Sequence, residues 1–260
     1  MNYELFIYKK APISFKYYNN HKPCTLVCLH GFLEYKEIFD FLVTDDIHEK
    51  YNILTIDLLG HGQSGNIGYV HHMDDQADMV FDLISFLKIN EIVLLGHSMG
   101  GYVGLHFLNH YNKYVNNLIL LNSSAKDDSQ ERKVNRLRGI ELVKKNKTIF
   151  IQMAVSNLFK EEIKKSKCDQ IATFKNKAVE ISTQGCIAAM YGMLERKDQT
   201  QLLYNTDKII YMGGLDDELI TKEDVKNEIS GTHTTAYFVK GGHMLWLENP
   251  DEIKKLLINL

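Results

Sequence analysis

The sequence predicts an α/β fold, with a mostly parallel central sheet of about eight strands and helices on both faces. Two observations carry this prediction. Apolar runs of strand length alternate with helical patterns through much of the chain. Several of these runs are also apolar at every position, as strands covered on both faces are. The 260 residues, 45% of them hydrophobic, suffice for one large core with a small helical insertion.

The core is expected to contain eight strands and five helices. Residues 3–7 and 13–18 are expected to form an antiparallel hairpin at a sheet edge. Six further strands are expected at 25–29, 53–56, 92–95, 118–121, 208–212 and 235–239. Helices are expected at 37–49, 75–87, 102–110 and 222–229, and from Asn249 to the end. The periodicity is clearest in 75–87, where apolar residues recur at helical spacing (Ala77, Val80, Phe81 and Ile84).

The composition changes at Ser124. From residue 126 to 200 the sequence shows no convincing strand, but it shows helical stretches at 131–145, 149–159, 168–181 and 185–194. We therefore expect a core of residues 1–125 and 201–260 and a helical cap of residues 126–200. The cap carries a net charge of +6, and the rest of the chain carries −9. We interpret this charge as solvated helix faces, with attraction of an anionic substrate as the alternative.

Overall composition narrows the classes of function. A net charge of −3 gives no reason to expect nucleic acid or an anionic membrane as a partner. The sequence shows neither a secretory apolar segment in residues 1–10 nor a run of transmembrane length. The spacing of the four cysteines fits no zinc pattern, and Cys24 and Cys28 are interpreted as small core residues on one strand face. These features predict a cytoplasmic, reduced protein.

One stretch carries most of the chemistry. The apolar run 92–95 is followed by Gly96-His97-Ser98-Met99-Gly100, and a helical pattern comes next. A G-x-S-x-G between a buried strand and a helix is typical of a nucleophile elbow, in which the serine hydroxyl projects from a sharp turn. Both flanking glycines suit a backbone that must pass close to its neighbours. The alternative interpretation is an ordinary glycine-rich turn between a strand and a helix, without a catalytic role.

A serine hydroxyl is a weak nucleophile and needs a base that is oriented by a carboxylate. In a parallel sheet these groups are expected at the carboxyl ends of strands. Asp216 comes just after the strand 208–212, and His243 lies in a glycine-rich loop after the next strand. The order Ser98, Asp216, His243 is the one that the nucleophile-elbow fold uses.

These motifs together resemble the α/β-hydrolase superfamily over essentially the whole chain. The resemblance rests on five short segments: His30-Gly31-Phe32, residues 57–64 (DLLGHGQS), the elbow with Gly101, Gly213-x-x-Asp216, and Gly242-His243. Within the superfamily the chain is similar to small cytosolic esterases, lactonases and cofactor-free haloperoxidase-like enzymes with a helical cap. The resemblance implies an α/β-hydrolase fold and a Ser-Asp-His triad, but it says little about substrate.

The resemblance also assigns roles to single residues. Family spacing places the acid three residues after a glycine, so Gly213 selects Asp216 over the adjacent Asp217. The backbone N–H groups of Phe32 and Met99 are expected to form the oxyanion hole.

Other candidate residues keep two interpretations. His30 either contacts substrate or braces its loop, and bracing is favoured; His97 is expected to be structural. Six apolar side chains of the cap either line an acyl pocket or form the cap's own core, and the core is favoured for most of them (Phe150, Met153, Phe159, Met190, Tyr191 and Met193).

Two further motifs are set aside. Residues 60–65 spell G-x-G-x-x-G, but the sequence predicts no helix opening there, as a dinucleotide site requires. His71 and His72 are adjacent, yet no third metal ligand is evident nearby. We therefore expect neither a cofactor nor a metal.

The sequence as a whole predicts a serine hydrolase acting on a small ester, thioester or lactone through an acyl-enzyme on Ser98. A small-molecule acyl compound is the expected partner, and the chain is expected to be a monomer or a homodimer. The alternatives are a related lyase or carbon–carbon hydrolase, and a ligand-binding receptor with residual hydrolase activity.

Overall fold

A computed structural model describes residues 4–260 and contains an eight-stranded sheet in the order β1-β2-β4-β3-β5-β6-β7-β8. Neighbouring strands from β4 to β8 are parallel, whereas β2 pairs antiparallel with both β1 and β4. The strands are β1 (Glu4–Tyr8), β2 (Ala11–Tyr18), β3 (Thr25–Leu29), β4 (Asn52–Ile56), β5 (Ile92–His97), β6 (Val115–Leu121), β7 (Ile209–Gly214) and β8 (Thr235–Val239).

Helices connect these strands, and the longest connection is the helical segment between β6 and β7. Those of the core are η1 (Lys36–Leu42), α1 (Asp45–His48), α2 (Met73–Phe86), α3 (Met99–Tyr111), η2 (Asn112–Tyr114), α9 (Lys222–Glu228), α10 (Leu245–Glu248) and α11 (Pro250–Asn259). Those between β6 and β7 are α4 (Gln130–Ser156), α5 (Glu161–Ser166), α6 (Cys168–Ala178), α7 (Thr183–Leu194) and α8 (Gln201–Asn205).

The sheet separates two apolar cores, because successive side chains of a strand face opposite sides. Val27 and Leu29 pack with α2 and α3 on one face. Leu26 and Cys28 pack with η1, α10 and α11 on the other face. All five residues of β3 are buried, as are all five of β4, which explains why both strands are mostly apolar on both faces. The predicted fold class is confirmed.

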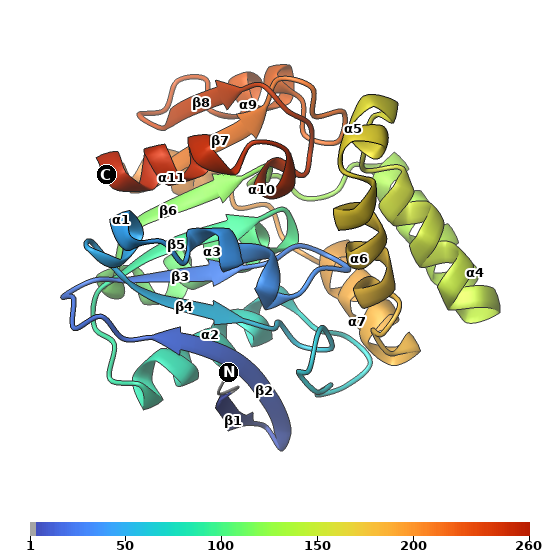
Figure 1. The fold of residues 1–260 in the computed structure, drawn as a ribbon, viewed down its shortest axis with the longest axis horizontal. Coiled ribbons are helices and arrows are strands. Elements are labelled where there is room, and N and C mark those ends of the chain that lie inside the picture. Colours follow the sequence, from blue (N-terminus) through green and yellow to red (C-terminus); the bar gives the residue numbers. More distant parts are fainter. Residues whose placement is uncertain (1–3) are drawn as a thin grey trace.

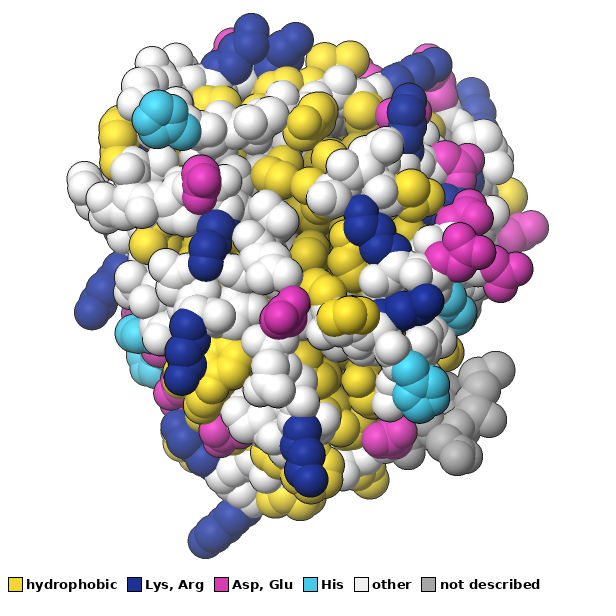
Figure 2. Space-filling view, turned by 90° about the vertical axis from the view of Figure 1, so that its left-hand side faces the viewer, with side chains coloured by type: hydrophobic (Ala, Val, Ile, Leu, Met, Phe, Trp, Pro, Cys, Tyr) yellow, Lys and Arg dark blue, Asp and Glu magenta, His cyan; other side chains and the backbone are white. Residues whose placement is uncertain are grey.

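The parallel strands run toward the cap, so their carboxyl ends meet it (Figure 1). This edge is where α/β sheets place their ligands. Figure 2 shows the face at the opposite ends of the strands, where Lys and Arg side chains are scattered over the visible surface. Among the described residues, no helix combines the length and apolar character needed to cross a membrane.

Several predicted boundaries differ from the observed ones. The helix expected at 37–49 is instead the 3-10 helix η1 followed by the short α1, because Val43 and Thr44 leave helical geometry between them. The first predicted strand begins at Tyr3, which lies outside the described residues. The helix after Ser98 begins at Met99, earlier than the predicted residue 102.

The segment predicted to be the cap holds α4 to α7, and no strand occurs in it among the described residues. Two predicted cap helices are merged into α4 with a break at Asn146, whose Oδ1 accepts a hydrogen bond from Ile149 N at 3.0 Å. A close backbone approach holds α7 against the core. A Cβ at Gly185 would lie 2.3 Å from Gly60 O, and one at Gly192 would lie 1.8 Å from the carbonyl oxygen of His71.

Candidate active site

Ser98 occupies the turn between β5 and α3 in a conformation that side chains rarely adopt. Its φ is 48° and its ψ is −113°, outside the main allowed regions for a non-glycine residue. The flanking glycines make the turn possible. A Cβ at Gly100 would lie 2.0 Å from Leu29 O, and one at Gly96 would lie 2.5 Å from Gly100 O. The nucleophile-elbow geometry is therefore built by the sequence G-x-S-x-G.

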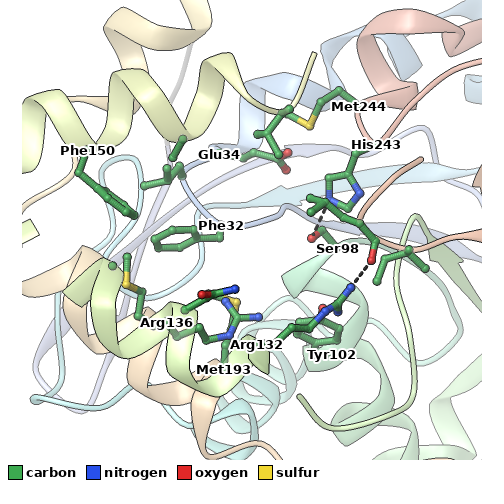
Figure 3. A pocket seen from close by; sticks show the side chains of 18 residues that line it. Phe32, Glu34, Ser98, Tyr102, Arg132, Arg136, Phe150, Met193, His243 and Met244 are labelled. Carbon is green, nitrogen blue, oxygen red and sulfur yellow. Dashed lines mark hydrogen bonds between the residues drawn. The ribbon is translucent and has the colours of Figure 1, made fainter. Parts of the chain in front are cut away.

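His243 lies directly against the Ser98 hydroxyl. Its Nε2 is 3.1 Å from Ser98 Oγ, and its Nδ1 is 2.9 Å from Asp217 Oδ2. Because an ionised carboxylate only accepts hydrogen bonds, Nδ1 carries the proton, and Nε2 is left as the acceptor toward Ser98. Figure 3 shows His243 and Ser98 side by side at one end of a cavity. The arrangement matches a serine nucleophile, a histidine base and an orienting acid.

The prediction of Asp216 as the acid is wrong in this structure. Asp216 is exposed, and its Oδ1 pairs with Lys160 Nζ at 2.8 Å. The adjacent Asp217 has a side chain that is 0% exposed and contacts His243. The spacing argument failed by one residue, because the chain reaches the position beside His243 only at Asp217.

Asp217 is held by four hydrogen-bond donors. Besides His243, Asn122 Nδ2 donates to its Oδ2 at 2.8 Å. The N–H groups of Leu219 and Ile220 donate to Oδ1 at 2.8 and 3.0 Å. Burial by itself raises the pKa of Asp217, but the charge of His243 and these hydrogen bonds outweigh burial and hold the pKa below its ordinary value. The carboxylate is therefore ionised in the neutral pH range.

Sequence reasoning missed Asn122. This residue follows β6 at a φ of 47°, a conformation that asparagine tolerates better than most side chains. Its Nδ2 bonds both Asp217 and the carbonyl oxygen of Gly242, at 2.8 and 3.2 Å. It therefore ties the loop of the acid to the loop of the histidine. The signal in the sequence was an asparagine directly after a predicted strand, at the sheet edge where the catalytic groups were expected.

A second buried carboxylate, Glu34, organises the loop after β3. It accepts hydrogen bonds from Gly31 N, from His97 Nδ1 at 2.9 Å and from Trp246 Nε1 at 3.3 Å. The other ring nitrogen of His97 donates to the carbonyl oxygen of His243 at 2.9 Å. This network joins the predicted oxyanion loop, the elbow strand and the loop that carries the base. It also gives His97 a bridging position, in keeping with its predicted structural role.

The partners in this network fix its charge state. Both nitrogens of His97 face oxygen acceptors, so both carry protons and the ring is an imidazolium. Burial lowers the pKa of His97, but the Glu34 carboxylate outweighs burial and raises it. Likewise burial raises the pKa of Glu34, and the positive charge and hydrogen bond of His97 lower it by more. The pair is a fully buried ion pair beside His243.

A cavity of about 340 Å³ opens next to Ser98, between the core and the cap. Phe150 and Met190 line it, as one interpretation of the cap's apolar residues predicted. Met153 does not line it, because its side chain faces solvent and is 60% exposed. The remaining lining is mostly apolar and includes Phe32, Leu33, Ala154, Leu158, Met193, Leu219, Ile220 and Met244.

His30 does not line the cavity, so the less favoured interpretation, that it contacts substrate, is wrong in this structure. Both ring nitrogens are used by the backbone: Nδ1 donates to Gly31 O at 2.8 Å, and Nε2 accepts from Leu58 N at 3.0 Å. The side chain is completely buried, and burial lowers its pKa. His30 braces the loop, which is the role that the sequence analysis favoured.

The two predicted oxyanion donors belong to segments that adjoin this site. Met99 is the first residue of α3, where backbone N–H groups have no partner within the helix. Phe32 borders the cavity in the loop that Glu34 holds. Their role in binding an oxyanion stays a prediction.

One group of side chains could hold a metal ion. Asp74 Oδ1 lies 2.6 Å from His106 Nδ1 and 3.0 Å from His110 Nε2. His106 is eight residues beyond Ser98 along α3, or about 12 Å by helix geometry, and neither it nor its two partners lines the cavity. The G-x-G-x-x-G at residues 60–65 stays in a loop, since α2 begins only at Met73.

The chain resembles known hydrolases in sequence. The family described as "Serine aminopeptidase, S33" matches residues 21–250. An uncharacterized hydrolase of Bacillus subtilis (strain 168), YugF, is 32% identical over 115 residues, or 44% of this chain and 41% of YugF. The chain thus spans about two fifths of the length of that curated relative.

Solved structures agree with this likeness. An esterase from Thermogutta terrifontis, solved with malate bound, has a TM-score of 0.86 at 25% identity and covers 96% of this chain and 92% of its own. The enol-lactonase of Burkholderia xenovorans LB400 has a TM-score of 0.88 at 16% identity, covering 98% of both chains. The second likeness concerns the fold alone.

Proposed function

Because the chain belongs to the α/β-hydrolase family described as serine aminopeptidase, S33, we propose that it cleaves a small carboxylic ester, thioester or lactone through an acyl-enzyme on Ser98. One observation carries the proposal: the unbroken path from Ser98 Oγ to His243 Nε2 at 3.1 Å, and from His243 Nδ1 to Asp217 Oδ2 at 2.9 Å. Each contact is within the reach that proton transfer and orientation require.

The reaction follows from this path. Ser98 Oγ attacks the substrate carbonyl while its proton passes to His243 Nε2. Asp217 stabilises the imidazolium that forms, and the N–H groups of Phe32 and Met99 bind the oxyanion. The leaving group then takes the proton from Nε2. Water, deprotonated by the same nitrogen, attacks the acyl-enzyme. Nε2 then returns this proton to Ser98 Oγ as the acyl–Oγ bond breaks and the carboxylic acid leaves.

The cavity supports an ester or lactone better than the peptide amine that the family description suggests. An aminopeptidase must hold a free ammonium group, which requires an anionic or strongly accepting partner. Glu34, the carboxylate that lines the cavity, is already bonded to His97 and Trp246. Arg132 and Arg136 also line the cavity and repel a cation.

The experiment combines covalent labelling with turnover. A fluorophosphonate probe should label the wild-type protein and fail to label Ser98→Ala, because only an activated hydroxyl reacts readily. The wild type should also turn over 4-nitrophenyl butyrate for many cycles, and Ser98→Ala should not. Circular dichroism and thermal melting of both proteins serve as the folding control.

Each other outcome points to a different conclusion. Labelling that survives in Ser98→Ala would refute the assignment of the nucleophile. Labelling followed by a single turnover would favour a ligand-binding receptor with residual activity. Labelling without hydrolysis of esters, thioesters or lactones would favour the related lyase or the carbon–carbon hydrolase.

A further inference from the structure

The cap places positive charge on one wall of the cavity. Arg132, Asn135, Arg136 and Gly139 all line it, and their spacing of three or four residues puts them on one face of α4. The face therefore changes along the helix, from two guanidinium groups near its start to apolar side chains such as Phe150 and Ala154 beyond the break at Asn146. The cavity has a cationic end and an apolar end.

The cationic end is the one next to the catalytic groups. Arg132 Nη2 donates to the carbonyl oxygen of Leu219. The N–H of that same Leu219 donates to Asp217 Oδ1 at 2.8 Å. Figure 3 shows this hydrogen bond of Arg132 close to Ser98 and His243, whereas Phe150 lies at the other end of the cavity. A group bound by Arg132 would thus be a short distance from the reacting carbonyl.

The guanidinium groups near this wall outnumber the carboxylate that pairs with them. Arg136 and Arg196 share one carboxylate, the buried Asp128, so one positive charge of this trio is left over. Within residues 4–260, the hydrogen-bond partner of the Arg132 guanidinium is a neutral carbonyl, which leaves its full charge. Arg196 also lies 3.9 Å from the ring centroid of Tyr102, which itself lines the cavity. Of these three arginines, Arg132 and Arg136 line the cavity and place positive charge on its α4 wall.

We propose that the cavity selects acyl substrates that carry an ionised carboxylate, bound by Arg132 with support from Arg136. This inference rests on the proposed function and adds a substrate class to it. A guanidinium that has given one N–H to a backbone carbonyl keeps further donors, and its planar edge pairs well with a carboxylate. The mostly apolar remainder of a 340 Å³ cavity suits a short hydrocarbon spacer. Half-esters of dicarboxylic acids and carboxylated lactones have this composition.

The test compares two esters that differ by one charge. 4-Nitrophenyl hydrogen adipate carries the carboxylate, and 4-nitrophenyl methyl adipate is its neutral counterpart; the adipate chain also keeps self-hydrolysis slow. The wild type should prefer the anionic ester in kcat/KM by about tenfold or more, the value of a charge-assisted hydrogen bond. Arg132→Gln should lower the anionic-to-neutral ratio by about ten- to hundredfold.

Arg138→Gln is the matched control, because Arg138 lies on α4, is exposed and does not line the cavity. It should keep the wild-type ratio. A wild-type ratio near one, or an equal loss of both activities in Arg132→Gln, would overturn the inference. If neither ester is hydrolysed and the fluorophosphonate does not label Ser98, the proposed function fails instead.

A binding measurement separates the two failures further. Monomethyl adipate and dimethyl adipate can be titrated into the unreactive Ser98→Ala protein by calorimetry. The monoanion should bind at least about tenfold more tightly than the diester, and Arg132→Gln should remove that difference. Equal binding of the two compounds would refute the inference whatever the catalytic outcome.

Discussion

The sharpest prediction contrasts two adjacent carboxylates, through the variants Asp217→Asn and Asp216→Asn. An asparagine at 217 has one acceptor oxygen and one donor group in place of two acceptor oxygens. If its oxygen faces the N–H groups of Leu219 and Ile220, its amide N–H₂ faces His243 and Asn122. His243 can then accept at Nδ1 only by moving its proton to Nε2, and the ring no longer accepts a proton from Ser98.

The opposite orientation of the amide also carries a penalty. The amide N–H₂ would then face the two backbone N–H groups that now donate to Oδ1 at 2.8 and 3.0 Å. Two buried donors left unpaired cost about 2 to 6 kcal/mol together. We therefore expect kcat to fall by about 10³- to 10⁴-fold, which corresponds to about 4 to 5.5 kcal/mol of activation free energy.

Asp216→Asn should change kcat by about twofold or less, because this variant removes only an exposed ion pair with Lys160. Turnover of 4-nitrophenyl butyrate gives kcat for both variants, and the rate of fluorophosphonate labelling gives a second measure of the activated serine. Circular dichroism checks that each variant is folded. A larger loss in Asp216→Asn than in Asp217→Asn would refute the geometry described for the acid.

Two further predictions concern the surroundings of this path. Glu34→Gln should destabilise the protein by about 3–5 kcal/mol, because it leaves the His97 charge buried and unpaired; denaturant unfolding from pH 4 to 9 measures this loss. Because the pKa of His97 is raised, the stability that its charge contributes is fully present below the ordinary pKa of histidine. This contribution is lost as the pH rises through the raised pKa. Because the pKa of Glu34 is lowered, the stability that its charge contributes is fully present above the ordinary pKa of glutamate. This contribution is lost as the pH falls through the lowered pKa. The difference in unfolding free energy between wild type and Glu34→Gln should therefore be largest between the ordinary pKa values of glutamate and histidine. A difference that does not vary with pH would contradict the ion pair. Gly100→Ala should lower both folding yield and labelling of Ser98, since its Cβ would lie 2.0 Å from Leu29 O; Gly68→Ala, where a Cβ would meet nothing within 4 Å, is the control, and equal behaviour of the two variants would contradict the close approach.

The fold could be predicted because its signals are local and repeated. Strands such as β3 and β4 are apolar on both faces, and only a sheet covered on both sides buries such residues fully. Ser98 could be found for a similar reason, because the glycines on either side of it are needed for the close backbone contacts of a single turn. The boundaries of helices were predicted less well. Nothing in the sequence of residues 37–49 indicated that Val43 and Thr44 would leave helical geometry.

The surroundings of the triad could not be predicted, because they depend on contacts between distant segments. Glu34 meets His97 and Trp246, which are 63 and 212 residues away in sequence. Asn122 meets Asp217 across 95 residues. A lone glutamate or asparagine in a loop is unremarkable by itself, and its function appears only when the fold brings buried donors to it.

The error at Asp216 shows what decides between neighbouring carboxylates. The backbone after β7 continues to follow the chain beyond β8, because Leu215 N donates to Val239 O at 2.8 Å and Asp216 N donates to Gly241 O at 2.9 Å. Extended pairing ends at Gly214, and Leu215 and Asp216 form a turn that Asp217 N closes by donating to Gly214 O at 3.3 Å. Counting three residues from Gly213 stops inside this turn, at Asp216, whose side chain is exposed. The turn is held by the segment after β8, so residue spacing on one strand alone cannot fix which aspartate meets His243.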